Sequence, residues 1–278
     1  MRIRELISQA QKALVQKGLS LSEAEREVLL LLGHLLGLRP LEVYFYEGEL
    51  SEVERPFWEL LSRRKKGVPL AYLLGEVEFF GRPFVVAPGV LIPRPETEIL
   101  VEAVLERLSP PGWVLELGVG SGCVALTLAA EGGFKILGIE ISRKALEIAQ
   151  KNRLRLGLGA QVFWVQGDWC APLRPGPHFK AVVSNPPYIS EEEWASLPEE
   201  VKDYEPREAL WGGEKGLDFI VQTLREAPRY LCPGGYVFLE LGYQQQEEAA
   251  RWARALGYRV EFVKDLLGHA RVLVASFP

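Results

Sequence analysis

From residue 113 to the end of the chain, short apolar runs alternate with amphipathic segments, and this order restricts the fold more than any other feature. The runs typical of strands cover residues 113–118, 135–140, 161–168, 180–185 and 236–242. Helix-like segments separate most of them, so we expect an α/β fold with a mostly parallel sheet covered on both faces. Only a short turn separates the last two runs, 258–265 and 270–277, so at least one of these strands should be antiparallel.

The first 75 residues show a different pattern of apolar residues, which predicts a small bundle of helices. Apolar residues from Ile3 to Leu14 recur at helical spacing. The pattern Ser22–Glu25 is typical of a capping box and predicts the start of a second helix. A third helix is expected over about 52–66. We interpret its basic end, residues 63–66, as solvated, with a partner contact as the alternative.

The stretch "EVEFFGRPFVV", residues 76–86, consists of two short apolar runs around a Gly-Arg-Pro turn, which predicts a β-hairpin. The expected organisation is therefore a helical domain over 1–75, a hairpin linker over 76–88 and an α/β domain over 89–278. Pro95 lies near an expected helix start, where a proline is well tolerated.

Charge and composition exclude several classes of function. The net charge is −5, and residues 1–75 carry 11 Lys and Arg against 10 Asp and Glu, so direct nucleic-acid binding is not expected. The three cysteines and three histidines are scattered, which predicts no metal site and reduced thiols. No signal peptide or membrane-spanning run is visible, so we expect a cytoplasmic protein without membrane contact; nothing in the sequence requires more than a monomer.

The loops that follow the expected strands carry unusual residues. Gly118, Gly120 and Gly122 follow the first strand of the α/β domain and predict close approach to a nucleoside-containing cofactor, with a tight turn as the alternative. Glu140 ends the next strand, where a carboxylate can accept hydrogen bonds from both ribose hydroxyls. Asp168 and Trp169 follow the third strand, where they would hold an adenine. The alternatives are an exposed glutamate, a turn aspartate and a packed tryptophan.

The most informative stretch is "SNPPY", residues 184–188. The two prolines have no N–H, and Asn185 is pushed toward an extended conformation by the proline that follows it. The Asn185 side-chain oxygen and the Pro186 carbonyl would then form two rigid acceptors. Such a pair suits an NH₂ group, because binding both of its hydrogens orients the nitrogen and frees its lone pair. Tyr188 would stack on the planar amide or base.

An adenine, two ribose hydroxyls and an electrophile for a neutral NH₂ group together indicate S-adenosyl-L-methionine, with S-adenosyl-L-homocysteine as the product. Catalysis would rest chiefly on positioning and desolvation. No strong general base is required, because the nitrogen becomes a strong acid once it is methylated.

The combined motifs resemble one family across nearly the whole chain. They read "FFGRPFVV", "LIPRPETE", "ELGVGSGCVAL", "SNPPYI", "EPREALWGGEKGLDF" and "CPGGYVFLELG". Asn-Pro-Pro-Tyr occurs in methyltransferases that act on adenine, cytosine or glutamine amino groups. The full set resembles the HemK or PrmC family, the protein-glutamine methyltransferases of peptide chain release factors. The resemblance implies a Rossmann-like class I methyltransferase fold.

The resemblance also implies the substrate and the site residues. The substrate would be the glutamine of the Gly-Gly-Gln loop in class I release factors, whose methylation modulates translation termination, and the helical domain would help to hold the release factor. The implied catalytic residues are Asn185, Pro186 and Tyr188, and the implied substrate-binding residues are Leu91, Asn185, Pro186, Pro187 and Tyr188. The implied cofactor-binding residues are Glu116, Gly118, Val119, Gly120, Ser121, Gly122, Glu140, Asp168, Trp169 and Asn185.

Two residues depart from the family pattern: Val119 replaces a frequent threonine and Glu140 a frequent aspartate.

Three other functions compete with the main interpretation. A DNA or RNA amino-methyltransferase should carry a basic groove and a base-flipping or target-recognition domain. A non-enzymatic adaptor would bind the cofactor and have no methyl acceptor. The glycine motif of an NAD enzyme would have its third glycine at position 123, where this chain has Cys123.

Overall fold

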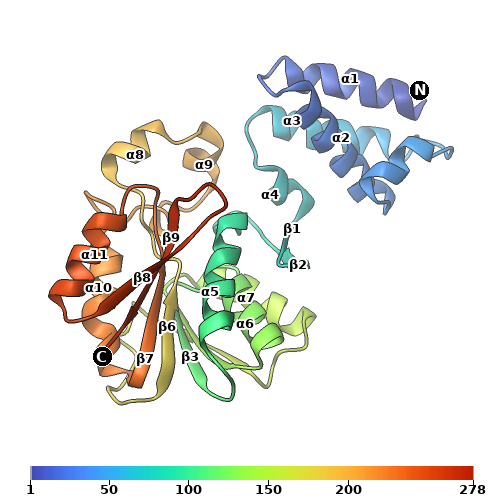
Figure 1. Cartoon of the computed structure of the whole chain (residues 1–278). Helices are drawn as coiled ribbons and strands as arrows, with labels where there is room; N and C mark the ends of the chain where they lie inside the picture. Colours follow the sequence, from blue (N-terminus) through green and yellow to red (C-terminus); the bar gives the residue numbers. More distant parts are fainter. Residues whose placement is uncertain (1, 278) are drawn as a thin grey trace. The chain divides into compact units, whose positions relative to one another are not determined.

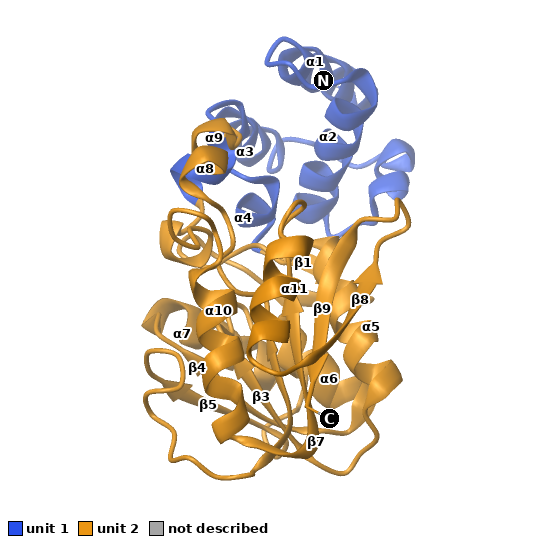
Figure 2. Cartoon of the chain, turned by 60° about the vertical axis from the view of Figure 1, so that its left-hand side comes forward, with its two compact units in different colours: residues 1–75, 199–204 blue, residues 76–198, 205–278 orange. Residues whose placement is uncertain are grey.

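The computed structural model describes residues 2–277, which form two compact units (Figures 1 and 2). The first unit takes in the chain up to Gly75 together with the short segment Glu199–Tyr204. The second unit takes in Glu76–Pro198 and the chain from Glu205 onward. Each unit has its own hydrophobic core.

The first unit is built entirely from helices. Its elements are α1 (Ile3–Val15), α2 (Leu21–Leu36), the 3₁₀ helix η1 (Pro40–Phe45), α3 (Glu54–Lys65), α4 (Leu70–Leu74) and α9 (Glu199–Tyr204). The apolar face predicted for the first helix is the face that α1 buries. Phe57 and Leu61 of α3 complete the core that α1 and α2 begin. Gly75 has a left-handed backbone with a φ of 75° and ends α4 just before the first strand.

The predicted start of the second helix is wrong by two residues. The cap of α2 is Ser20, whose backbone N–H donates to Glu23 Oε2 at 2.9 Å while its hydroxyl accepts from the Glu23 backbone N–H. Ser22 and Glu25 lie inside the helix. The sequence contains two overlapping Ser-x-x-Glu patterns, and the earlier one caps because the helix extends back to Leu21.

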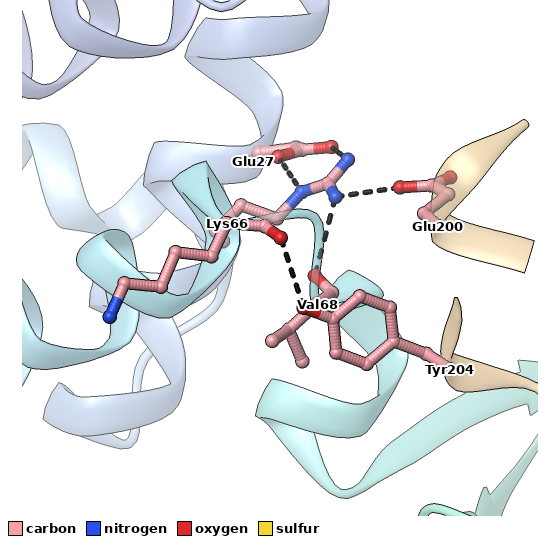
Figure 3. Close-up of polar contacts among 6 residues, drawn as sticks. Glu27, Lys66, Val68, Glu200 and Tyr204 are labelled. Carbon is pink, nitrogen blue, oxygen red and sulfur yellow. Dashed lines mark hydrogen bonds and ion pairs between the residues drawn. The ribbon is translucent and has the colours of Figure 1, made fainter.

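The segment α9 is distant in sequence from the other helices of its unit, and an ionic cluster attaches it (Figure 3). The Arg64 guanidinium pairs with Glu27 at 2.7 Å and with Glu200 at 2.7 Å. The Tyr204 hydroxyl donates to the Lys66 carbonyl at 2.9 Å. The Arg64 side chain is 11% exposed, so the interpretation of residues 63–66 as a fully solvated helix end is wrong at this residue.

The second unit contains a hairpin and a seven-stranded sheet with its helices. The hairpin strands β1 (Glu76–Phe79) and β2 (Arg82–Val85) pair antiparallel, as predicted. The sheet strands are β3 (Trp113–Leu117), β4 (Lys135–Glu140), β5 (Val162–Gln166), β6 (Phe179–Ser184), β7 (Leu231–Glu240), β8 (Arg259–Lys264) and β9 (Ala270–Ser276). The helical segments are η2 (Pro95–Thr97), α5 (Glu98–Arg107), α6 (Cys123–Gly132), α7 (Arg143–Arg155), α8 (Glu191–Ser196), η3 (Arg207–Ala209), α10 (Asp218–Glu226), η4 (Ala227–Arg229) and α11 (Gln246–Ala255).

The sheet has the order β5-β4-β3-β6-β7-β9-β8, with β9 antiparallel to both of its neighbours and the other pairings parallel. Alternate residues along each strand enter opposite cores: Ala181 and Val183 pack on one face and Val182 on the other. Helices α5, α6 and α7 cover the first face, and α10 and α11 cover the second (Figure 1). The predicted fold class is confirmed, including the antiparallel strand near the end of the chain.

One strand is longer than predicted. The sequence places its start at Tyr236, but β7 begins at Leu231 and takes in the Cys-Pro-Gly-Gly segment, with a register shift against β6. Between residues 2 and 277, no helix combines the length and the apolar character needed to cross a bilayer.

Candidate active site

The strand order reverses between β3 and β6, which lie side by side although 61 residues separate Leu117 from the start of β6 at Phe179. Open α/β sheets bind ligands at such a switch point, beyond the carboxyl ends of the strands. The Ser184 hydroxyl donates to the Leu117 carbonyl at 2.6 Å and ties the two strand ends together. The glycine loop after β3 and the Asn-Pro-Pro-Tyr loop after β6 therefore begin at the same place.

The glycine loop has a backbone that other residues rarely adopt. The φ angles are 76° at Gly118, 55° at Gly120 and 81° at Gly122. A Cβ on Gly120 would meet nothing within 4 Å, whereas one on Gly122 would lie 3.3 Å from the Ala149 Cβ. Gly118 and Gly120 line the cavities described next, and Gly122 instead provides close packing of the loop on α7.

Three adjoining cavities open at this edge of the sheet, and Leu91 and Asn185 line all three. The first holds Gly118, Gly120, Glu140, Asp168, Trp169 and Pro187 among its lining residues. The second is lined by Thr97, Glu116, Gly118, Val119, Gly120 and Ser121, among others. The third is lined by Arg94, Pro186 and Tyr188 together with Ile189, Ala209 and Leu210. All predicted site residues except Gly122 thus meet around Leu91 and Asn185.

Glu140 ends β4 and is nearly buried, with backbone donors on both carboxylate oxygens. Gly120 N–H donates to Oε2 and Ser142 N–H to Oε1, each at 2.9 Å. Burial raises the pKa of Glu140, against these hydrogen bonds, which lower it. Each oxygen keeps a further lone pair, so the carboxylate can still accept hydrogen bonds from hydroxyl groups in the first cavity.

Trp169 lines the same cavity from a strained backbone, with a φ of 47°. Its indole N–H donates to the Thr223 hydroxyl at 3.1 Å, and its ring centroid lies 5.0 Å from that of Phe219. The indole N–H is therefore not available to a ligand, but an aromatic wall of Trp169 and Phe219 faces the cavity. Sequence reasoning missed Phe219, although it belongs to the quoted stretch "GEKGLDF".

Glu116 is a buried carboxyl group at the second cavity. It is 2% exposed, its Oε2 has no hydrogen-bond partner within residues 2–277, and burial raises its pKa well above the ordinary value. An unpartnered buried oxygen is costly unless a ligand satisfies it. An ammonium group in the cavity would do so.

The charges of the first cavity also discriminate between cofactors. Among the residues that the structure describes, its lining includes Glu140, Asp168 and Glu208 and no Lys, Arg or His. A dinucleotide pyrophosphate is anionic and would be repelled, whereas a cationic sulfonium with an α-ammonium group is favoured. The residues therefore fit S-adenosylmethionine. In the described chain, no group of three or more His, Cys, Asp and Glu side chains is placed to hold a metal.

The Asn185 amide is held at one end only. Its Nδ2 donates to the Thr97 hydroxyl at 3.1 Å, while its Oδ1 has no hydrogen-bond partner among the residues that the structure describes. The Pro186 carbonyl is likewise unengaged within residues 2–277. Asn185 and Pro186 both line the third cavity, so both acceptors face it from the turn formed by Asn185–Tyr188, which is called the corner below. Sequence reasoning did not assign Thr97 a role.

Residues from distant segments contact the backbone of the corner and fix its position. Gln245 Nε2 donates to the Tyr188 carbonyl at 2.8 Å and to the Gly216 carbonyl at 2.9 Å. A Cβ on Gly212 would lie 2.4 Å from the Pro187 carbonyl oxygen. These contacts explain physically why the stretch "WGGEKG" carries glycines at 212 and 216.

Glu205 attaches the loop that carries Leu91 and Thr97. Its carboxylate accepts from the Ile92 backbone N–H at 3.1 Å and pairs with the Arg94 guanidinium. Glu205 is 6% exposed, so the carboxylate that makes both contacts is buried. The stretches "LIPRPETE" and "EPREAL", far apart in sequence, are thus joined in the structure.

Comparisons with known proteins identify the relatives of this chain. Residues 5–75 match the family model of the PrmC N-terminal domain, and residues 114–204 match that of a methyltransferase domain. The release factor glutamine methyltransferase of Moorella thermoacetica is 42% identical over 282 residues, which cover 99% of this chain and 98% of the relative. That of Koribacter versatilis is 43% identical over 238 residues, which cover 84% of this chain and 83% of the relative.

A solved structure supports the fold. The methyltransferase from Pyrococcus furiosus aligns with a TM-score of 0.56 at 22% identity, covering 81% of this chain and 98% of that one. The length and identity of the sequence matches, together with both family models, confirm the resemblance stated from the motifs. The chain therefore belongs to the family of release factor glutamine methyltransferases.

Proposed function

We propose that the protein transfers a methyl group from S-adenosylmethionine to the side-chain amide nitrogen of the glutamine in the Gly-Gly-Gln loop of class I release factors, and thereby modulates translation termination. The names of the relatives support the release factor as the substrate. The helical unit would help to hold the release factor. A cytoplasmic monomer that binds no nucleic acid remains part of the proposal.

The observation that carries the proposal is the pair of free acceptors at the corner. Asn185 Oδ1 and the Pro186 carbonyl accept no hydrogen bond from residues 2–277, and Asn185 lines all three cavities. A planar NH₂ group that donates one hydrogen to each acceptor would be fixed in orientation. These two hydrogen bonds would also fix the direction of the nitrogen lone pair.

The residues of the first two cavities would hold the cofactor. Glu140 would accept from the ribose hydroxyls, Trp169 and Phe219 would line the adenine site, and the free Glu116 oxygen would accept from the ammonium group. When bound, S-adenosylmethionine supplies an electrophilic methyl group on a sulfonium. The chain's own contribution is to bind, orient and exclude water, because the methylated nitrogen loses its proton readily without a strong base.

The proposal is tested by offering methyl-labelled S-adenosylmethionine and the purified protein to three acceptors. These are a class I release factor, the same factor with the loop glutamine replaced by alanine, and double-stranded DNA. We expect label on the intact release factor alone. Label on DNA would favour a nucleic-acid amino-methyltransferase, and cofactor binding without any labelled acceptor would favour a binding adaptor.

A further inference from the structure

The proposed function brings a folded protein to the third cavity, because the glutamine that would enter it belongs to a release factor. The glutamine would reach the corner, Asn185–Tyr188, and the rest of the release factor would cover the enzyme surface around it. Exposed apolar surface near such a point is typical of a contact with another protein. The turn between β8 and β9, residues 265–269, provides surface of this kind.

Two adjacent leucines lie in this turn. Leu266 is fully exposed and Leu267 is 82% exposed, and no other large apolar side chain of residues 2–277 is as exposed. Tyr243 is 57% exposed and lies beside the turn, with its ring centroid 4.7 Å from that of His269. Tyr243, Leu266 and Leu267 together make an apolar surface that we call the apolar rim. Covering it would remove apolar area from water, which favours association.

Asp265 holds the turn in one shape. Its carboxylate accepts from the backbone N–H groups of Leu267 at 3.0 Å and His269 at 2.9 Å, and from the Arg271 guanidinium at 2.9 Å. The Asp265 backbone N–H donates to the His269 carbonyl at 2.9 Å. The two leucines are therefore presented on an ordered turn, so that a partner that covers them would lose little affinity to the ordering of a loop.

The sheet places this turn at the same edge as the corner. Ser184, which precedes the corner, pairs with Leu239 of β7, and Leu239 pairs with Leu273 of β9. Neighbouring strands lie about 4.8 Å apart, so β9 runs about 10 Å from β6 at this level. Because β9 is antiparallel to β7, the turn that precedes Ala270 projects from the edge at which β6 and β7 end.

Close contacts connect the corner with the apolar rim. Gly242 lies against the ring of Tyr188, because a Cβ on this glycine would be 3.2 Å from the Tyr188 Cδ2. Tyr243 follows Gly242 directly in the chain and packs edge-on against His269 of the turn. The apolar rim therefore begins beside a residue that lines the third cavity.

The size of a protein–protein interface indicates what would cover the apolar rim. A specific interface buries about 800 Å² on each partner, which corresponds to a patch with a radius of about 16 Å. The spacing of the strands places β9 about 10 Å from β6. A patch of this size centred on the corner therefore takes in the apolar rim, and the partner centred there is the protein that carries the glutamine.

We propose that the apolar rim is a docking surface for the release factor, which covers Leu266 and Leu267 with apolar residues next to its glutamine loop. The inference rests on the proposed function for the identity of the partner. It adds a contact in the second unit that fixes the release factor beside the third cavity. A second copy of this chain is the alternative occupant, and the experiment separates the two.

The key variant combines Leu266→Ser with Leu267→Ser. Both side chains are exposed, so the fold should be kept, and equal unfolding temperatures check this. The matched control is Leu154→Ser, which makes the same chemical change at a leucine that is 66% exposed. Leu154 lies in the last turn of α7, a helix that begins just after β4 ends and leads away from the edge that carries the corner.

The three proteins are compared with an intact class I release factor in the presence of S-adenosylhomocysteine, by calorimetry, and in steady-state methylation. We expect the double variant to raise the Kd and the KM for the release factor at least about tenfold, with kcat and the cofactor Kd within about twofold of wild type. Leu154→Ser should match wild type in all four values.

Two results would overturn the inference while the proposed function stands. One is an unchanged Kd and KM for the release factor in the double variant. The other is a wild type that sediments as a dimer beside a double variant that sediments as a monomer, because the leucines would then join two copies of the chain. A wild type that neither binds nor labels the release factor would instead overturn the proposed function, and the docking surface with it.

Discussion

The backbone carbonyl oxygen of Tyr188 lies where a side chain on Gly216 would have to begin: a Cβ atom there would be 2.2 Å away. Gly216 also has a φ of 70°, so both its backbone and its surroundings require glycine. The segment 212–216 therefore packs directly against the backbone of the corner, Asn185–Tyr188, and fixes its position; we call this segment the wall. Gln245 joins the two by donating to both carbonyls, those of Tyr188 and Gly216.

The first prediction follows from this wall. Gly216→Ala should displace the Tyr188 carbonyl and lower kcat at least about a hundredfold, because misplacement of about 1 Å is enough for such a loss. The matched control is Gly234→Ala, where φ is a similar 73° but a Cβ would meet nothing within 4 Å. The control should lose about 1 kcal/mol of stability and keep its kcat. Equal kcat losses in both variants would show that the close contact is irrelevant.

The second prediction separates the substrate corner from the cofactor cavity. Asn185→Ala should abolish turnover while leaving the cofactor Kd within a few-fold, because it removes an acceptor for the substrate nitrogen. Glu140→Ala should do the reverse and raise the cofactor KM more than it lowers kcat. Steady-state kinetics and calorimetric binding of S-adenosylhomocysteine provide both readouts. Weak cofactor binding with normal turnover at saturation in Asn185→Ala would contradict the role assigned to it.

The third prediction concerns protons released on cofactor binding. Burial keeps the pKa of Glu116 well above the ordinary value in the free protein, and an ammonium group beside its Oε2 would lower that pKa. Binding should therefore release protons, and affinity should strengthen as pH rises toward the Glu116 pKa. Calorimetry in two buffers with different ionisation enthalpies measures the release. Glu116→Gln should reduce it, and an equal release in that variant would place the proton elsewhere.

The fourth prediction concerns stability and pH. Glu240 has its pKa raised from 4.5 to about 7 in the folded protein, so the folded state binds the proton more tightly than the unfolded chain does. The stabilising contribution is fully present below about pH 4.5 and is lost as pH rises through about 7. The unfolding free energy of wild type minus that of Glu240→Gln should fall by about 3 kcal/mol between about pH 5 and about pH 8. Denaturant titrations at both pH values measure the difference, and a difference independent of pH would contradict the raised pKa.

Much of the fold was predictable because its signals are local. Periodicity identified the sheet strands after Trp113, and the predicted bounds of β4 coincide with those of the structure. The glycine loop, Glu140, Asp168 and the Asn185 corner were predictable because each follows a strand whose end the sequence marks. Their convergence follows from the topology of a parallel sheet.

The supporting residues could not be predicted, because their partners are remote in sequence. Gln245 stands in a run of three glutamines that reads as an exposed helix start, and its contact with Tyr188 spans 57 residues. Thr97 and Glu240 belong to quoted motifs but show no chemistry until the structure places them beside Asn185 and Tyr188. The ion pair of Arg64 with Glu200 could not be predicted for the same reason, because the two residues are 136 positions apart.

The central claim is that Asn185 Oδ1 and the Pro186 carbonyl hold the two hydrogens of the substrate amide. The most direct measurement is the crystal structure of the protein with S-adenosylhomocysteine and a peptide that contains Gly-Gly-Gln. We expect the glutamine Nε2 within about 3 Å of both oxygens, on the side that faces the cofactor sulfur. A glutamine nitrogen bound elsewhere, or a corner turned away from the sulfur, would contradict the account.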